Sequence, residues 1–239
     1  MARVALFVTC VADQLFPDTA WSTVRLLEAA GDTVEFPEAQ TCCGQPALAA
    51  GERDAVPRLA HHFLDTFAGY DAVVAPSGSC TAMVHHWYKE LVPERAAEVE
   101  ALAARTYELT QYLVDVRGLV DVGARVDATV TVHDACHGLR TLGLAHPTRR
   151  LLAAAGATIV ELTEPETCCG FGGVFAAEYP EVSTKLADAK LADARATSAQ
   201  YLVSTDLACL MHLEGRARRV RSGPRAIHVA DLLAPGLPA

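Results

Sequence analysis

The sequence predicts an α/β protein made of two tandem repeated halves, each a small, mostly parallel sheet flanked by helices, with the halves related by a pseudo-two-fold axis. Eight cysteines fall into two sets with nearly the same spacing. In each half, short apolar and β-branched runs alternate with helical patterns, which is typical of parallel sheets covered by helices. The repeat period, about 125 residues, suits a duplicated small domain.

The cysteine repeat defines the two halves. Each half has one cysteine, 31 intervening residues, a Cys-Cys-Gly sequence and a last cysteine 36 or 39 residues further on. The two sets are Cys10, Cys42, Cys43 and Cys80, and Cys136, Cys168, Cys169 and Cys209. Neighbouring residues repeat too, since RLLEAAG at 25–31 matches RLLAAAG at 150–156. We therefore expect one domain at 1–120 and a second at 121–239, joined near 117–127.

The elements are expected in the same order in both halves. The first half should contain strands at 4–8, 33–36, 72–75 and 106–109, with helices around 21–27 and 52–67. The second half should contain strands at 128–132, 158–162, 201–203 and 226–229, with helices around 151–155 and 180–199. Gly31 and Gly156 suit left-handed helix ends, and Pro180 suits a first helical turn.

The cysteines all follow predicted strands. Because the carboxyl ends of parallel strands meet at one edge of a sheet, where open α/β sheets hold their ligands, each set of four thiols should converge there. Two adjacent cysteines can both face such a site only in a tight, irregular turn. Gly44 and Gly170 permit that turn because they lack a Cβ, and backbone N–H groups of the turns could stabilise buried thiolates.

Four converging thiols are the ligand set of an iron–sulfur cluster or of zinc. We expect an iron–sulfur cluster in at least one half and up to one per half, with all eight cysteines as ligands; zinc is the alternative. His133 and His137 flank Cys136. They could donate hydrogen bonds to a cluster or supply an imidazole ligand, or they could be loop histidines that cap a helix.

Composition excludes several other classes of function. The chain has 239 residues, of which 51% are hydrophobic and 21% charged, so it should be globular. A net charge of −9 disfavours binding to nucleic acids or anionic lipid. The lack of a long apolar stretch and of a signal peptide predicts a cytoplasmic chain without membrane insertion. Without a G-x-G-x-x-G or P-loop motif, nicotinamide, flavin and nucleotide sites have no support.

The doubled pattern resembles the cysteine-rich CCG domain. That domain is shared by heterodisulfide reductase B, the iron–sulfur subunit of glycolate oxidase and the lactate utilization protein A group, and a stand-alone chain of this length is most similar to the last group. The resemblance covers essentially the whole chain. Its strongest segments are CCGQP at 42–46, PSGSC at 76–80, HDACH at 133–137, CCGFGG at 168–173 and TDLAC at 205–209.

The resemblance implies an iron–sulfur electron carrier in a three-protein system that oxidises L-lactate to pyruvate. Its partners would be a ferredoxin-like iron–sulfur protein and a further lactate-utilization subunit. Glycolate or another 2-hydroxy acid is equally compatible with the residues. Two other functions stay open: a zinc-binding assembly module without a redox role, and a cluster-dependent thiol–disulfide (heterodisulfide) reductase.

One departure from the heterodisulfide reductase pattern bears on the type of cluster. That family ends each motif in Cys-x-x-Cys, whereas here Ser77 and Asp206 stand at the first of those positions and one thiol remains in each stretch. Four thiols per half suffice for a conventional [4Fe–4S] cubane. The departure therefore weighs against the non-cubane cluster and against disulfide chemistry.

Overall fold

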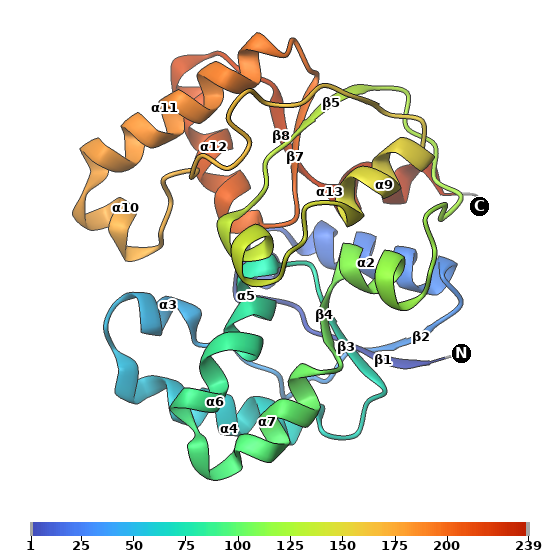
Figure 1. The fold of residues 1–239 in the computed structure, drawn as a ribbon, viewed down its shortest axis with the longest axis vertical. Helices are drawn as coiled ribbons and strands as arrows, with labels where there is room; N and C mark the ends of the chain where they lie inside the picture. The colour runs from blue at the N-terminus through green and yellow to red at the C-terminus, as the bar shows by residue number, and fades with distance from the viewer. Residues whose placement is uncertain (1, 238–239) are drawn as a thin grey trace.

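The computed structural model describes residues 2–237, and its two halves share one sheet topology (Figure 1). The first sheet has the order β2-β1-β3-β4 and the second the order β6-β5-β7-β8, with every neighbouring pair parallel. The strands are β1 (Arg3–Leu6), β2 (Thr33–Glu35), β3 (Ala72–Ala75), β4 (Thr106–Glu108), β5 (Thr129–Val132), β6 (Thr158–Ile159), β7 (Tyr201–Ser204) and β8 (Arg225–His228). The predicted two-half α/β fold is confirmed.

Helices connect the strands of the first half. Its α-helices are α1 (Cys10–Leu15), α2 (Pro17–Ala29), α3 (Gln45–Ala49), α4 (Val56–Phe67), α5 (Gly78–Ala82), α6 (Tyr88–Leu91), α7 (Ala96–Ala103) and α8 (Leu109–Gln111). Short 3₁₀ or π segments are η1 (Arg53–Ala55), η2 (Met83–Trp87), η3 (Pro93–Arg95) and η4 (Tyr112–Val116). The predicted helix at 52–67 therefore opens with a 3₁₀ turn before α4.

The second half has fewer helices, and two of them are long. Its α-helices are α9 (Pro147–Ala154), α10 (Val174–Glu178), α11 (Pro180–Ala196), α12 (Leu207–Val220) and α13 (Val229–Leu233), with short segments η5 (His137–Thr141) and η6 (Ala234–Gly236). Pro180 starts α11, as predicted. Gly31 and Gly156 have φ of 82° and 93°, so both are the expected left-handed residues after a helix. No helix within residues 2–237 is long and apolar enough to cross a membrane.

Two predicted strands end two or three residues earlier than expected. The strand predicted at 4–8 ends at Leu6, because the N–H of Val8 donates to the side chain of Gln40 instead of to a neighbouring strand (2.8 Å). The strand predicted at 158–162 ends at Ile159, after which the N–H of Val160 makes one more bond to β5. The segments that follow these two strands lead into the loops that carry cysteines.

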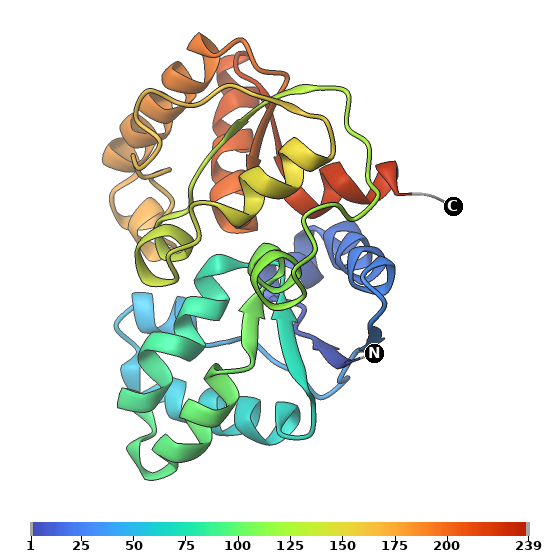
Figure 2. The ribbon, with the colours of Figure 1, turned by 45° about the vertical axis from the view of Figure 1, so that its right-hand side comes forward.

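The two halves share a hydrophobic core. One face of each sheet is covered by helices of its own half, with Phe7 and Phe63 in the first half and Leu191 and Leu213 in the second. The other faces contribute to one common cluster that includes Leu27 and Leu152. Helices α2, α9 and α13 lie between the sheets in that layer (Figures 1 and 2).

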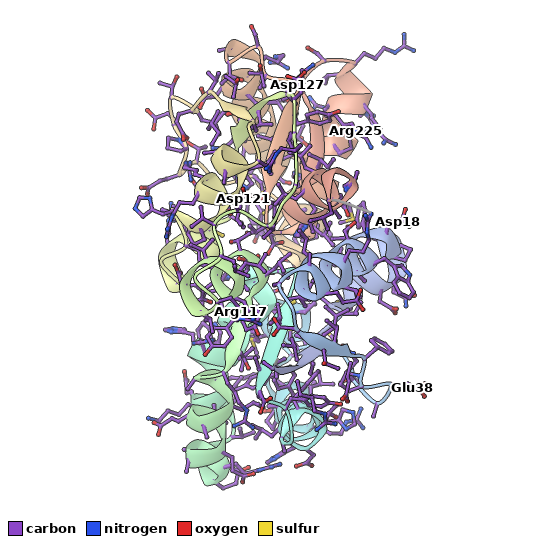
Figure 3. All side chains as sticks on the ribbon, turned by 90° about the vertical axis from the view of Figure 1, so that its right-hand side faces the viewer. Asp18, Glu38, Arg117, Asp121, Asp127 and Arg225 are labelled. Atoms are coloured by element: carbon purple, nitrogen blue, oxygen red, sulfur yellow. The ribbon has the colours of Figure 1, made fainter. Side chains whose placement is uncertain are left out.

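The chain crosses from one half to the other after η4. Arg117 anchors the start of this segment, because its guanidinium pairs with the buried carboxylate of Asp32 and donates to the carbonyl of Ala30 (2.9 Å). Asp121 and Asp127 follow on the exposed crossing (Figure 3). The domain limits 1–120 and 121–239 stay a prediction, since the common core joins both halves.

Candidate metal centres

The structure places all eight cysteines beyond the carboxyl ends of parallel strands. Cys10 is the first residue of α1, Cys80 lies in α5 and Cys209 lies in α12. Cys136 immediately precedes η5. The two Cys-Cys-Gly turns occupy the loops after β2 and β6. The sheet topology thus gathers thiols that are far apart in the sequence, four in each half.

In the first half the four thiols interact as one group. The Sγ atoms of Cys10 and Cys42 are 3.6 Å apart, and Cys42 accepts from the N–H of Gly44 (3.5 Å). The hydrogen bond with Cys42, together with burial and the charges of Cys42 and Cys80, raises the pKa of Cys10. Hydrogen bonds with Cys42 and Cys80, followed by burial, raise the pKa of Cys43. All four predicted ligands of this half are therefore in one place.

Two polar side chains hold the first Cys-Cys-Gly turn. The amide of Gln40 accepts from the N–H of Val8 and donates to the carbonyl of Leu6 (3.0 Å), which ties the loop to the end of β1 beside Cys10. The hydroxyl of Tyr88 donates to the carbonyl of Cys43 (2.8 Å). Tyr88 is fully buried, so this bond is shielded from water.

The second half repeats the arrangement with a tighter pair. The Sγ atoms of Cys169 and Cys209 are 3.1 Å apart, and the N–H of Gly170 donates to Cys168 (3.3 Å). Burial, followed by the charge of Cys168, raises the pKa of Cys136. A hydrogen bond with Cys169 lowers the pKa of Cys209, but burial and the charges of Asp206, Cys136 and Cys168 raise it above its ordinary value. This half likewise brings its four predicted ligands together.

Gly170 is required by a close approach of backbone. Its φ is +89°, and a Cβ there would lie 2.5 Å from the carbonyl oxygen of Ser183 in α11. Gly44 has the same φ sign, at +90°, but its nearest neighbour would be the Val56 side chain at 3.0 Å. Both glycines support the predicted tight turn, and only the second is pressed against a helix backbone.

Lys190 supports the second turn, although sequence reasoning did not single it out. Its side chain is 1% exposed, and its ammonium donates to the carbonyls of Glu164 (2.7 Å) and Pro165 (3.1 Å), just before the cysteine pair. The signal was present in the sequence. Lys190 lies on the same helical stripe as Ala187 and Ala194, which face the core.

The two candidate histidines occupy different environments. His133 is 2% exposed at the end of β5, and neither ring nitrogen has a hydrogen-bond partner among the described residues. One ligand atom each from His133, Cys169 and Cys209 lies within 4.8 Å of the other two. His137 opens η5, and its Nδ1 lies 3.8 Å from the Sγ of Cys136. Both histidines adjoin the second set of thiols.

Burial keeps His133 neutral. Desolvation, aided by the nearby charge of Lys190, lowers the pKa of His133 to about 3. A neutral imidazole has a free nitrogen lone pair and can therefore bind a metal. Phe7 stands at the corresponding position of the first half, because Leu6 and Val132 end the equivalent strands. Each half thus has its own four thiols, and only the second half adds this buried nitrogen base.

The donor chemistry fits a soft metal or a cluster. Hydrogen bonds from Cys10 and Cys43 lower the pKa of Cys42 to about 3, while the same interactions raise the pKa of Cys10 and Cys43. One thiolate forms readily, but its charge opposes ionisation of its neighbours. A bound cation removes that opposition, since metal ligation requires deprotonated cysteine.

The two sets of thiols are linked by a polar contact between the halves. Ser77 caps α5, which carries Cys80, and Asp206 caps α12, which carries Cys209. The backbones of Ser77 and Asp206 form an isolated antiparallel bridge, and Asp206 accepts from the N–H of Ser79 (2.9 Å). The cysteine-bearing helix starts of both halves therefore meet at one junction.

Comparison with known proteins agrees with the repeat. Residues 4–85 and 130–214 each match the family described as CCG, cysteine-rich domain. Lactate utilization protein A of Bacillus cytotoxicus (strain DSM 22905 / CIP 110041 / 391-98 / NVH 391-98) is 40% identical over 235 residues, covering 97% of this chain and 98% of the relative. Lactate utilization protein A of Exiguobacterium sp. (strain ATCC BAA-1283 / AT1b) is 41% identical over 243 residues, covering 99% of both.

Similarity to solved structures is weaker. Glutamate racemase from Francisella tularensis subsp. tularensis SCHU S4, in complex with D-glutamate, is 12% identical with a TM-score of 0.38, covering 98% of this chain and 78% of that one. This likeness has no bearing on the chemistry of the site. The thiols and the sequence relatives are what bear on function.

Proposed function

This chain belongs to the cysteine-rich CCG domain family and, within it, to the lactate utilization protein A family, and on that premise we propose that it is the iron–sulfur electron-transfer subunit of a complex that oxidises L-lactate to pyruvate. The names of its relatives support the lactate-utilization role. The partners would be a ferredoxin-like iron–sulfur protein and a further lactate-utilization subunit, in the cytoplasm, where thiols stay reduced.

The convergence of four thiols in each half is the observation that carries this proposal. Cys10, Cys42, Cys43 and Cys80 would hold one cluster, and Cys136, Cys168, Cys169 and Cys209 would hold the other. When bound, a cluster accepts and releases single electrons. The chain's own contribution is to supply thiolate ligands and to donate backbone N–H groups to them from the Cys-Cys-Gly turns. It also buries two thiols of each half, those of Cys43, Cys80, Cys169 and Cys209.

Anaerobic purification tests the proposal directly. The protein should be brown, with broad absorbance at about 400 nm and about eight irons per chain if both halves hold a [4Fe–4S] cluster. Addition of dithionite should bleach this absorbance. A colourless, iron-free protein from an anaerobic preparation that yields an intact control ferredoxin would contradict the proposal.

Single cysteine substitutions test whether each half holds its own cluster. Cys42→Ser and Cys169→Ser should each halve the iron content, because the ligands of the two sets come from different halves. The remaining cluster should keep its own reduction potential. Loss of all iron from either variant would mean that the halves share ligands.

A zinc site in the second half is a second candidate, favoured by one specific observation. The ligand atoms of His133, Cys169 and Cys209 lie within 4.8 Å of one another, a compact mixed set that suits a single tetrahedral ion. The first half has Phe7 in place of the histidine and does not share this feature. In this alternative the first half holds a cluster and the second holds zinc.

Metal analysis of the second half separates the two candidates. If the second half binds zinc, wild-type protein should contain one zinc and about four irons. His133→Ala should then lower the zinc content and leave the iron unchanged. If the second half binds a cluster, the same variant should leave zinc absent and instead shift one of two reduction potentials, because imidazole near a cluster tunes it.

A further inference from the structure

An open apolar groove runs along the first half between α2 and the β1–β2 edge. Its volume is about 440 Å³, and Leu6, Val24 and Val34 contribute to its lining. Two aromatic side chains also line it and are unusually open to solvent, Trp21 at 70% and Phe36 at 53%. The sequence pattern correctly predicts a helix through Trp21, but the indole takes no part in the core. Exposed aromatic pairs of this kind often mark binding sites.

In the second half, ion-paired side chains occupy the equivalent position. The helix and strand registers equate Val24 with Arg149, Val8 with Asp134 and Phe36 with Glu161. The guanidinium of Arg149 pairs with Asp134 (2.8 Å) and with Glu161 (2.7 Å), where the first half has three apolar side chains. The repeated fold is therefore compatible with a polar, filled surface at these positions. The apolar groove of the first half needs a reason other than folding.

Charge around the groove favours a basic occupant. Asp13 and Glu28 line it, and within residues 2–237 neither carboxylate forms a salt bridge. Asp18, at the start of α2, and Glu38, after Phe36, project from the same side of the molecule (Figure 3). With a net charge of −9, the whole chain adds to this field. A segment carrying lysine or arginine beside its apolar contacts would complement the groove.

The groove adjoins the first set of thiols. Val8 and Asp13, which both line it, lie two residues before and three residues after Cys10. Cys10 itself is only partly buried. An occupant of the groove would therefore sit beside the first candidate cluster, the position required of a protein that exchanges electrons with it.

We propose that this groove, defined by Trp21, Phe36, Val24, Asp13 and Glu28, binds a partner electron-transfer protein through an apolar side-chain cluster bordered by lysine or arginine. Trp21 and Phe36 are the anchors, since aromatic residues in a groove dominate binding energies at such interfaces. The carboxylates steer and orient the basic border. The identity of the partner, a component of the same lactate-utilizing system, rests on the proposed function.

The test measures binding of the anaerobically purified full-length chain to each of the two other lactate-utilization subunits of the same organism, by titration calorimetry. Trp21→Ser/Phe36→Ser should cause at least about a tenfold loss of affinity for one of these subunits. Asp13→Asn/Glu28→Gln should reduce the salt dependence of that affinity. The matched control is Tyr179→Ser/Val182→Ser, which removes side chains of similar exposure (56% and 50%) from the second half and should leave the affinity unchanged.

Several results would overturn the proposal. These are unchanged affinity of the groove variant for both subunits, equal weakening by the control variant, or failure of wild-type protein to bind either of them. A change in the chain's own oligomeric state on Trp21→Ser/Phe36→Ser would identify a second copy as the occupant instead. Iron content of each variant is measured in parallel, because loss of the proposed cluster would concern the proposed function and not the groove.

Discussion

Ser77 and Asp206 pair across the pseudo-two-fold axis, each at the start of a helix that carries a cysteine. Their backbones form an antiparallel bridge, and Asp206 accepts from the N–H groups of Ser79 and Ala208 (2.9 and 3.2 Å). Both side chains are almost fully buried, at 4% and 3% exposure. The positions where the heterodisulfide reductase pattern has additional cysteines are thus occupied here by the polar contact that joins the halves.

Asp206→Ala should destabilise the chain by about 2 kcal/mol, because it removes the cap of α12 and takes away the acceptor of the partly buried N–H of Ser79. Urea unfolding of the anaerobic protein measures the change. Asp188→Ala is the control, since Asp188 is partly exposed and pairs only with Arg216, and it should cost less than about 1 kcal/mol. Equal losses in the two variants would contradict the structural role of Asp206.

Glu108 should make stability fall as pH rises. Burial raises its pKa from 4.5 to about 7, against hydrogen bonds from Thr110 and Gln111 that lower it. A carboxyl whose pKa is higher in the folded chain contributes stability that is complete below pH 4.5 and is lost as pH rises through about 7, with a total of about 3 kcal/mol. Glu108→Gln keeps an acceptor for the cap of α8 and removes this titration.

The measurement is the free energy of unfolding of wild type and Glu108→Gln at several pH values between about 5 and 9. As pH rises and the carboxyl of the wild type ionises, the free energy of unfolding of Glu108→Gln should increasingly exceed that of the wild type. Parallel pH profiles would show that Glu108 does not titrate in this range.

Gly170→Ala should be more damaging than Gly44→Ala. Both substitutions place a side chain at a left-handed φ, at a cost of about 1–2 kcal/mol. At Gly170 the new Cβ also meets the Ser183 carbonyl oxygen at 2.5 Å, and backbone cannot yield as the Val56 side chain can at Gly44. Gly170→Ala should therefore lower both the melting temperature and the metal content of the second half. A milder effect than that of Gly44→Ala would disprove this comparison.

Lys190→Met should loosen the loop before Cys168. The substitution keeps the buried aliphatic stem and removes the ammonium that satisfies the carbonyls of Glu164 and Pro165. Metal should dissociate faster from the second half, measured by chelator competition, while the first half is unaffected. Lys185→Met, at an exposed position on the same helix, is the control and should leave both rates unchanged.

The cysteine spacing predicts the two repeats, the parallel sheets and an edge that carries the thiols. These features can be predicted because strand ends and the turn between adjacent cysteines depend on residues close together in the sequence. Strand limits deviate where a side chain replaces a sheet partner, as Gln40 does for Val8. Spacing also places His133 near Cys136, but its burial and its unpaired nitrogens depend on β7 and on the helices packed beside it.

Other features arise only when segments that are distant in the sequence pack together. Lys190 shares a helical stripe with core alanines, but its bond to the Glu164 carbonyl forms only when α11 covers that loop. Asp206 resembles an ordinary helix cap until Ser79 of the other half approaches it. Trp21 has the spacing of a core residue, yet no element of the described chain covers it. Sequence periodicity records which residues share a face. Which faces become buried, and against what, is decided by contacts between segments that are distant in the sequence, as when Ser79 meets Asp206, 127 residues away.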